Sequence, residues 1–576
     1  MALLVLTGAA ERRPKPPVSD SETVQGPLGL ALDRYLMQLE TFGFSGSVLV
    51  AKDGQIVLHK GYGLADRERK RPYTPATIFD VASISKQFTA AAILKLETEG
   101  KLKVEDPLSK FLGALPGRKS EITLHMLLTH SSGLPDLLGE EYEPTSREAM
   151  VRRAMEAALV YAPGKRFHYS NLGYNLLAAV VEIASKEPYE SYLHDHLFVP
   201  AGMLHTGFHV PDRDLVAHGY TPTGDWGTPF DHPWAPDGPY WNLRGNGGIL
   251  STTGDLYRWH LALEDDTVLS QPEREKLITP WVSQGRQIHA SYGYGWGIEK
   301  DPKGGRLVDH IGGNLVFDSD FRRYLDANVV IIASSNGTDY SSIAVTPHLE
   351  SRIFGLPDPE PPAAAPVDPA LLARRAGAYA LAGGERLQVS ASGKLLAVTA
   401  QGTQAFALLL GLRDADDREN MAARLQKTAE ALDGLRTGNG KPWAELRSLP
   451  VPRATVEAQA ALAPWQEKLG AWKGTEVLGN ESYGGHPYSY ARLTFEKGTK
   501  IAELGWSGMG VETLHFLDAP PPVLFVPQAD GSFASYDVRT GTSVRLTFED
   551  PGGGAPAELV VHTADGVVKA TRSQIQ

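Results

Sequence analysis

The sequence places a serine and a lysine one helical turn apart at the start of an apolar segment. Ser83 and Lys86 open a stretch dense in helix-forming residues that runs to Glu99, and Gly100 follows where a helix would end. Because three residues span about one helical turn, the hydroxyl and the ammonium can touch. A hydroxyl is a weak nucleophile unless a base takes its proton, and burial can lower the pKa of a lysine enough to supply that base. The pattern predicts nucleophilic catalysis by Ser83.

Two further polar groups follow later in the chain. Tyr169 and Asn171 are separated by one residue and come after a Pro-Gly turn, and a His-Ile-Gly-Gly run begins at His310 between two predicted strands. Each has a structural alternative: Tyr169 as a core tyrosine, Asn171 as a helix cap, and His310 as a histidine at a strand end. The first 356 residues contain no Gly-x-Ser-x-Gly elbow, phosphate-binding loop or HExxH helix that would compete with them.

Taken in order, Ser-x-x-Lys, Tyr-x-Asn and His-x-Gly resemble the signature of the serine β-lactamase and penicillin-binding-protein superfamily. The resemblance is to the class C-like branch, which includes family VIII carboxylesterases, D-aminopeptidases and D,D-carboxypeptidases. Three other stretches fit this branch, namely residues 127–135 (LLTHSSGLP), 200–203 (PAGM) and 247–252 (GGILST). The resemblance covers about residues 30–345 and implies an antiparallel sheet flanked by helices, with a helical subdomain.

The resemblance also implies a role for each matched residue. Ser83 would be the nucleophile, Lys86 its partner base, and Tyr169 a second base that acts as phenolate or through Lys86. The backbone N–H groups of Ser83 and Gly313 would form the oxyanion hole, and a glycine there lets the backbone approach a developing oxyanion. The substrate-binding and oxyanion residues would be Asn171, His310, Gly312 and Gly313.

Two features bear on the acyl group. Five aromatic residues in a loop either pack that loop or form an apolar acyl pocket: Trp226, Phe230, Trp234, Tyr240 and Trp241. His310 stands where related β-lactamases have a lysine, and a mostly neutral imidazole holds a substrate carboxylate less well near pH 7. Both features favour esters over carboxylate-bearing substrates.

We therefore expect a serine hydrolase that cleaves carboxylic esters through an acyl-enzyme on Ser83, with weak β-lactam hydrolysis as a side activity. One alternative is a D-aminopeptidase or a D,D-peptidase or amidase. Another is a catalytically silent penicillin-recognising or scaffold protein. No cofactor and no metal are expected, and His194 and His196 are interpreted as part of a helix rather than as metal ligands.

The pattern of helices and strands predicts that these residues are held in an α/β layered domain over residues 26–356. Residues 46–63 predict a β-hairpin around Asp53-Gly54, residues 145–159 and 172–186 predict helices, and residues 291–299 and 329–335 predict strands. Strands at both ends of the region imply a sheet closed by strands that are distant in sequence.

The rest of the chain has a different pattern of residues, with a proline-rich stretch followed by short predicted strands. Residues 357–369 hold six prolines and predict a stiff linker. Residues 370–411 and 516–576 predict an antiparallel β-barrel-like domain, with a strand at 406–410, and residues 412–515 an inserted α+β unit with an amphipathic helix at 414–435. Two successive β-rich domains are the alternative. The C-terminal region is expected to cover the active-site mouth or to mediate self-association.

The composition of the chain excludes several classes of partner and chemistry. The 576 residues carry a net charge of -12, which makes nucleic-acid phosphate an unlikely partner, and the absence of cysteine excludes thiol nucleophiles and disulfides. No apolar run is long enough to span a membrane. Residues 1–25 predict an N-terminal tail, and its start, Met1–Ala10, is either the remnant of a secretory signal or a frayed terminus. The compartment stays open between exported and cytoplasmic, a small-molecule ester or amide is the expected partner, and a homo-oligomer is compatible with the sequence.

Overall fold

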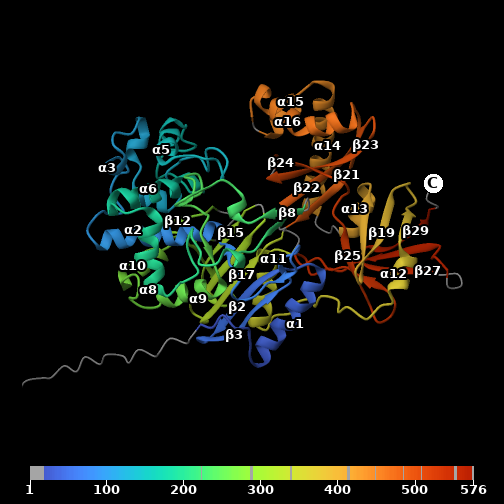
Figure 1. Ribbon diagram of the computed structural model, residues 1–576, viewed down its shortest axis with the longest axis horizontal. Coiled ribbons are helices and arrows are strands. Elements are labelled where there is room, and N and C mark those ends of the chain that lie inside the picture. The colour runs from blue at the N-terminus through green and yellow to red at the C-terminus, as the bar shows by residue number, and fades with distance from the viewer. Residues whose placement is uncertain are drawn as a thin grey trace, which may run out of the picture.

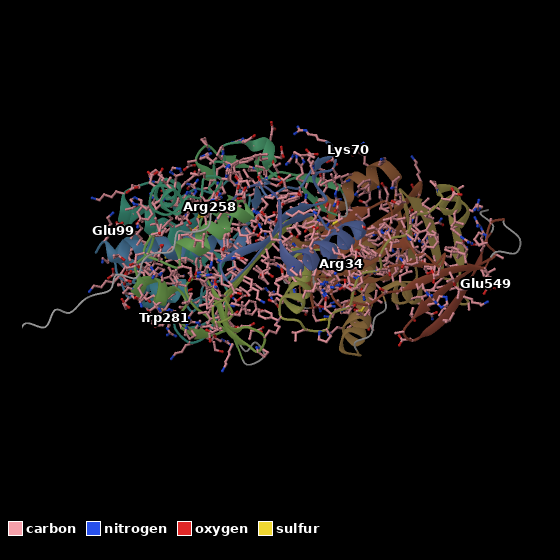
Figure 2. All side chains as sticks on the ribbon, turned by 90° about the horizontal axis from the view of Figure 1, so that it is seen from below. Arg34, Lys70, Glu99, Arg258, Trp281 and Glu549 are labelled. Atoms are coloured by element: carbon pink, nitrogen blue, oxygen red, sulfur yellow. The ribbon has the colours of Figure 1, made fainter. Side chains whose placement is uncertain are left out.

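The structure is a computed structural model of the 576-residue chain. It describes residues 18–573 apart from 222–223, 286–289, 315, 338–339, 411–414, 448, 484–485, 508 and 550–553, so the signal-like stretch Met1–Ala10 lies outside the described residues. A central sheet carries helices on both sides, and the C-terminal region follows on the right of Figure 1. In the turned view of Figure 2, Glu99 and Trp281 lie toward one end of the molecule and Glu549 lies toward the other.

Nine antiparallel strands form the central sheet, in the order β1-β3-β2-β17-β16-β15-β14-β13-β12. The hairpin at Asp53-Gly54 is confirmed, because both residues have positive φ values of 52° and 76°. β2 pairs with β17, which brings the two ends of this region side by side. The strands are β1 (Thr23–Val24), β2 (Gly46–Lys52), β3 (Gln55–Tyr62), β12 (Val282–Ser283), β13 (Ser291–Tyr292), β14 (Gly297–Asp301), β15 (Gly305–Gly313), β16 (Asp318–Tyr324) and β17 (Val329–Ser335).

Helices cover both faces of the sheet, because successive strand residues point to opposite sides. Val48 packs with α1 (Gly26–Phe42) and α11 (Ser342–Ile353) on one face, and Leu49 faces the larger core on the other. That core holds α2 (Ser85–Thr98), in which 11 of 14 residues are buried. Its neighbours are α3 (Ser109–Leu112), α4 (Leu124–Leu128), α5 (Arg147–Glu156), α6 (Asn171–Ser185), α7 (Tyr189–Leu193), α8 (Val199–Ala201), α9 (Thr253–Ala262) and α10 (Gln271–Leu277). The predicted β-lactamase-like layered fold is confirmed.

Short strand pairs outside the main sheet complete this region. They are β4 (Leu64–Asp66) with β5 (Arg71–Pro72), β6 (Phe79–Asp80) with β11 (Leu250–Ser251), β7 (Gly219–Thr221) with β8 (Gly224–Gly227), and β9 (Trp234–Ala235) with β10 (Gly238–Pro239). The β6–β11 pair matters most for function, because β6 leads directly into the turn that carries Ser83.

The C-terminal region contains a closed eight-stranded barrel, as expected. It begins after α12 (Pro369–Arg375), and its strands are β18 (Gly377–Ala380), β19 (Arg386–Ser392), β20 (Leu395–Gln401), β25 (Val523–Pro527), β26 (Phe533–Ala534), β27 (Arg545–Glu549), β28 (Glu558–Thr563) and β29 (Gly566–Arg572). Val526, Tyr536 and Val538 share a hydrophobic core with α1 and α11. The Tyr340 hydroxyl donates a hydrogen bond to the Tyr536 carbonyl at 2.5 Å. These contacts fix the barrel to the first region.

The segment between β20 and β25 forms a separate α+β unit. Its helices are α13 (Thr403–Leu410), α14 (Ala415–Thr437), α15 (Lys441–Arg447) and α16 (Val451–Leu469), and its strands are β21 (Trp472–Tyr483), β22 (His486–Phe495), β23 (Gly498–Ser507) and β24 (Gly510–Leu517). The strands form one antiparallel sheet in chain order. We call this unit the inserted unit, because β20 and β25 are paired neighbours in the barrel.

The strand predicted at 406–410 is wrong, because these residues belong to α13. A short apolar run fits a strand or a buried helix equally well, and tertiary contacts decide between them. Here the Phe406 ring stacks on Tyr490 of the inserted sheet, with ring centroids 5.8 Å apart. Among the helices of the described chain, none combines the length and apolarity needed to cross a bilayer.

Candidate active site

Ser83 lies in a tight 3-10 turn, Ala82–Ile84, directly before α2. Ala82 is buried and has a φ of 45°, a left-handed conformation that costs a non-glycine residue about 1–3 kcal/mol. The Asp80 carboxylate stabilises this turn by accepting a hydrogen bond from the Ala82 N–H at 2.8 Å. The strained turn holds the Ser83 side chain at the N-terminus of a buried helix, with its hydroxyl facing a cavity.

Lys86 contacts Ser83 as the sequence predicts. Its Nζ donates hydrogen bonds to Ser83 Oγ and to the Asn246 carbonyl, both at 2.9 Å. Burial lowers the pKa of Lys86 to about 7, although the carboxylates of Asp136 and Glu141 act in the opposite direction. A large share of Lys86 is therefore neutral near pH 7, and a neutral amine can accept the Ser83 proton.

Tyr169 completes a group of three side chains around the nucleophile. Its ring centroid lies 4.8 Å from Lys86 Nζ, and the Ser83 side chain acts to lower the pKa of the Tyr169 hydroxyl. Burial raises the pKa of Tyr169 above its ordinary value. The phenol is therefore protonated at neutral pH, and in this state it can donate a proton to a leaving group or relay one to Lys86.

The residues around Tyr169 fix its position. Ser170 caps α6, so the predicted alternative of Asn171 as the cap does not apply. The Ser170 N–H donates to His130 Nδ1 at 3.0 Å, and the His130 ring lies 4.2 Å from that of Tyr169. The Asn171 N–H donates to Asp136 Oδ1 at 2.9 Å. His130, which lies in the matched stretch 127–135, and Asp136, which follows that stretch, thus hold the segment that carries Tyr169.

His310 lies on β15 and lines the same cavity as Ser83. Its Nε2 is 2.9 Å from the Tyr292 hydroxyl, and its Nδ1 is 2.6 Å from the Ile311 carbonyl oxygen. A carbonyl only accepts, so Nδ1 carries the proton and Nε2 accepts from Tyr292. Burial lowers the pKa of His310 to about 3. The imidazole is therefore neutral near pH 7, unlike the charged lysine that related β-lactamases have at this place.

Gly312 and Gly313 bring β15 against the turn that carries Ser83. A Cβ at Gly312 would lie 2.2 Å from the Val81 carbonyl oxygen, so only glycine permits this approach. Asn314 donates to Asp80 Oδ2 at 3.1 Å, and thus one carboxyl group contacts both the nucleophile turn and the end of β15. Burial raises the pKa of Asp80 to about 7. This link is a feature that sequence reasoning missed.

A cavity of about 1070 Å³ opens beside Ser83, and Tyr169, His310 and Gly313 also line it. Asn171 and Gly312 are not among its lining residues. Four residues of the inserted unit line it as well, and we call them the wall residues: Tyr488, Gly505, Trp506 and Thr513. Three of them form one row across the inserted sheet, because Tyr488 pairs with Gly505 and Gly505 pairs with Thr513.

The five aromatic residues proposed for an acyl pocket do not act together. Trp226 lines the cavity and stacks on His232, with ring centroids 3.8 Å apart. Phe230 and Trp234 pack on each other instead, at 5.4 Å. Trp241 packs under the Arg244 guanidinium, and Tyr240 does not line the cavity. Of these five residues, Trp226 is therefore the one that lines the cavity.

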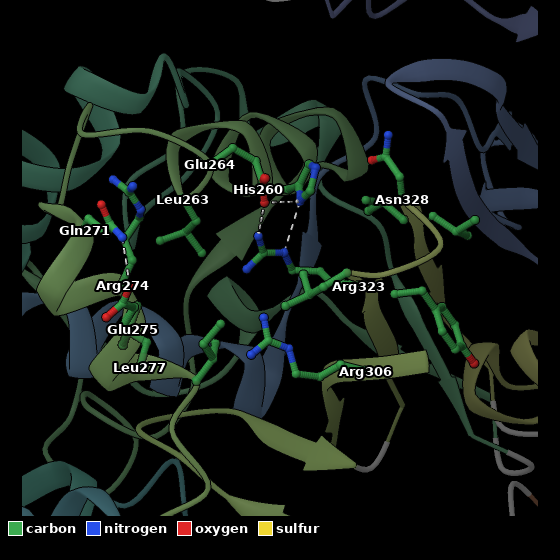
Figure 3. A pocket seen from close by; sticks show the side chains of 15 residues that line it. His260, Leu263, Glu264, Gln271, Arg274, Glu275, Leu277, Arg306, Arg323 and Asn328 are labelled. Carbon is green, nitrogen blue, oxygen red and sulfur yellow. Dashed lines mark hydrogen bonds and ion pairs between the residues drawn. The ribbon is translucent and has the colours of Figure 1, made fainter. Parts of the chain in front are cut away.

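A smaller hollow of about 320 Å³ lies away from Ser83 (Figure 3). Its buried guanidinium, Arg323, donates to His260 Nδ1 at 3.0 Å and to Glu264 Oε1 at 2.5 Å. These groups satisfy one another and include no nucleophile with a base. Elsewhere, His194 contacts Asp195 and His196 contacts Glu187. One cluster in the described chain has ligand atoms close enough for a metal ion: Glu68, His218 and Asp225.

Comparison with known proteins agrees with this geometry. The family model described as Beta-lactamase matches residues 43–349. Penicillin-binding protein 4* of Bacillus subtilis (strain 168) is 33% identical over 387 residues, which cover 62% of this chain and 85% of that protein. Protein flp of Staphylococcus aureus (strain MW2) is 36% identical over 331 residues, 53% of this chain and 62% of that protein.

The solved structure of an octameric penicillin-binding protein homologue from Pyrococcus abyssi resembles the whole chain in fold. It covers 94% of this chain and 100% of its own, with a TM-score of 0.52 and 21% identity. The family model alone spans more than half of the 576 residues and includes Ser83, Lys86, Tyr169 and His310. The chain therefore belongs to the beta-lactamase family, within the superfamily of serine hydrolases similar to penicillin-binding proteins.

Proposed function

We propose that this protein hydrolyses carboxylic esters through a covalent acyl-enzyme on Ser83. The observation that carries the proposal is the contact between Ser83 Oγ and Lys86 Nζ, 2.9 Å apart, at a serine that lines a large cavity. Burial brings the pKa of Lys86 to about 7, so the base is available at neutral pH without a metal or cofactor. A nucleophile in contact with its base is the expected arrangement for acyl transfer.

In the first half-reaction, Ser83 Oγ attacks the carbonyl carbon of the ester while its proton moves to Lys86 Nζ. The carbonyl electron pair shifts to oxygen, where the N–H groups of Ser83 and Gly313 are proposed to stabilise it. When the carbonyl re-forms, the bond to the alcohol oxygen breaks, and the alcohol leaves with a proton from Lys86 or, through relay, from Tyr169. The product is an ester between the acyl group and Ser83.

In the second half-reaction, water attacks the acyl-enzyme carbonyl. Lys86, neutral again, accepts a water proton, and the collapse of the intermediate returns a proton to Ser83 Oγ. The acid product and the free enzyme result, with Tyr169 as the proposed proton relay. The neutral His310 supports a preference for substrates that lack a carboxylate at this position, which sets β-lactams at a disadvantage.

Steady-state assays on p-nitrophenyl esters, D-amino-acid amides and nitrocefin test the proposal. Measurable ester turnover, together with a mass increase on Ser83 after ester soaking, is expected. Negligible ester turnover beside strong amide turnover would replace the esterase with an amidase or peptidase. If a fluorophosphonate probe leaves the mass of Ser83 unchanged, the protein is catalytically silent. Self-association, named in the description of the Pyrococcus abyssi protein, stays a prediction that light scattering can check.

A further inference from the structure

Two surface hairpins bring three side chains of the metal-binding types together. Glu68 lies in the turn between β4 and β5, His218 directly precedes β7, and Asp225 lies in β8. The candidate ligand atoms of these residues all lie within 4.8 Å of one another. Lys70, in the same turn as Glu68, marks this part of the surface in Figure 2. One imidazole and two carboxylates from distant segments of the chain thus form one group, which we call the hairpin cluster.

Buried hydrogen bonds hold the two hairpins against each other. The His218 N–H donates to the Ala65 carbonyl at 2.8 Å. The Asn336 side-chain amide, which is fully buried, donates to the Leu64 carbonyl at 3.1 Å and to the His218 carbonyl at 2.8 Å. The fold itself therefore fixes the position of His218 relative to the β4–β5 turn, as a preorganised binding site requires.

The two carboxylates of the hairpin cluster are each oriented by a hydrogen bond. The Tyr220 hydroxyl donates to Glu68 Oε2 at 2.8 Å, and the Gly227 N–H donates to Asp225 Oδ1 at 2.7 Å. Tyr220 is buried, and its hydroxyl oxygen also accepts from the Arg67 N–H at 2.6 Å. Both carboxylates therefore have the outer hydrogen bonds that are typical of metal ligands.

The histidine has one nitrogen toward the cluster and the other toward a buried acid. Its Nδ1 lies 3.0 Å from Asp225 Oδ2, and its Nε2 lies 3.6 Å from Asp66 Oδ2. The Asp66 side chain is 1% exposed, and its Oδ2 has no hydrogen-bond partner within the described chain. Arg69 Nε lies 3.8 Å from the same oxygen, on a side chain that is 71% exposed. Asp66 attracts the His218 proton to Nε2, so Nδ1 faces Asp225 as an acceptor, and a cation between the two relieves their repulsion.

We propose that the hairpin cluster binds one divalent transition-metal ion of the zinc type. Glu68, His218 Nδ1 and Asp225 are the ligands. Asp66 is a positioning residue for the imidazole. Nitrogen and oxygen ligands lie about 2.0–2.2 Å from zinc, so two ligands of one ion are at most about 4.4 Å apart. Glu68 and Asp225 are exposed, which lets their side chains close the remaining few tenths of an ångström.

The ion would join the β4–β5 turn to β8. Trp226 follows Asp225 in β8 and lines the cavity beside Ser83, so the ion would stabilise the hairpin that carries this lining residue. The ligands include none of the residues proposed for acyl transfer. The inference therefore goes beyond the proposed function and does not depend on it.

Isothermal titration calorimetry with ZnCl₂ tests the site on the untagged, full-length protein after treatment with EDTA. We expect one Zn²⁺ per chain and a melting temperature that rises with zinc concentration, because a ligand that binds the folded state stabilises it. CaCl₂ at the same concentrations should produce a much smaller rise, because calcium prefers oxygen ligands and an imidazole suits zinc.

Four variants assign the ligands. His218→Ala removes the nitrogen ligand and Asp225→Asn removes a charge at nearly constant shape, and each should weaken zinc binding by at least about 100-fold. Asp66→Asn should weaken it about 10- to 100-fold, the usual cost of losing a group that orients a metal ligand. The melting temperature of each metal-free variant separates these losses from a loss of fold.

His194→Ala is the matched control. His194 Nδ1 also contacts a carboxylate, Asp195 Oδ1 at 2.6 Å, but no third ligand completes this pair within the described chain. Its removal should leave zinc affinity unchanged.

Four outcomes would count against the assignment. The wild-type protein alone overturns it if it binds no zinc at a one-to-one ratio, which holds even if a variant does not fold. An equal rise in melting temperature with calcium would mean that the cluster attracts cations in general. An equal loss in His194→Ala would assign the zinc to surface histidines. Unchanged zinc affinity in Asp66→Asn would remove the positioning role of Asp66. Because none of these measurements uses an ester, their failure is distinct from failure of the proposed function.

Discussion

The proposed catalytic group (Ser83, Lys86 and Tyr169) and the wall residues meet at one cavity, which Ser83 and Tyr169 line directly, but they are held there differently. Ser83, Lys86 and Tyr169 come from one region. Lys86 Nζ lies 2.9 Å from Ser83 Oγ and from the Asn246 carbonyl oxygen, and 4.8 Å from the centroid of the Tyr169 ring. Tyr488, Gly505 and Thr513 come from a sheet more than 300 residues later in the chain and line the cavity as one row of paired residues across that sheet. We therefore expect the acyl-transfer chemistry and the access of substrate to the cavity to be changed independently by mutation.

The route of the chain explains why they are separable. Val398 and Leu396 of β20 pair with Val523 and Phe525 of β25, so the inserted unit leaves the barrel and returns at adjacent antiparallel strands. A short turn can join such strands. The barrel itself is anchored by its shared core with α1 and α11. We therefore expect the inserted unit to be dispensable for the chemistry, although its residues Leu478, Tyr490 and Ile501 share a hydrophobic core with the barrel.

The largest effect is expected from Ser83→Ala. Removal of the nucleophile should reduce ester turnover by about 10³-fold or more and abolish the acyl mass increase. Both are measured with p-nitrophenyl acetate and by intact-protein mass spectrometry, and melting temperature controls for folding. If ester turnover survives in this variant, the nucleophile is not Ser83, and the contrast between the catalytic group and the wall residues no longer holds.

Lys86→Met should cost about 10²- to 10⁴-fold in kcat/KM, the usual contribution of a general base. In the wild type, burial holds the pKa of Lys86 at about 7, below its ordinary value, and the neutral form is the base. Activity on an uncharged ester should therefore rise as pH increases through about 7. A wild-type profile that stays flat from pH 5 to 9 would contradict the role of Lys86.

Replacing residues 403–518 with a two-residue turn should act on access and leave the chemistry in place. The cavity loses its wall residues, so kcat/KM for a bulky aryl ester should rise about tenfold relative to p-nitrophenyl acetate. Tyr488→Ala should shift the same ratio in the same direction by a smaller factor. If acetate turnover collapses together with the bulky ester in a folded variant, the inserted unit contributes to catalysis and the two regions are not separable.

The smallest effect is expected from Tyr292→Phe. This change removes the hydroxyl that donates to His310 Nε2, a loss of about 1 kcal/mol or about fivefold in kcat/KM. Tyr294→Phe is a matched control, because that hydroxyl contacts His125 rather than His310. Equal effects of the two variants would show that Tyr292 contributes stability rather than the orientation of His310.

Prediction from sequence succeeded where the residues that determine an element all lie within one short segment. The Asp53-Gly54 hairpin and the buried helix after Ser83 are local, and the structure has both. The strand predicted at 406–410 failed because the partner of Phe406 is Tyr490, which no local pattern can reveal. The domain boundaries drawn from composition stay predictions, although the closed barrel itself is present.

The sequence by itself determined the Ser83–Lys86 pair, because one helical turn joins the two residues, and the family resemblance, because three short motifs follow one another in order. Only the tertiary structure decided which distant groups meet there. Asp80 contacts Asn314, Tyr292 sets the His310 tautomer, and Tyr488 of the inserted sheet lines the same cavity as Ser83. These are contacts between segments far apart in sequence, and their energies depend on burial, which is a property of the whole fold rather than of any segment.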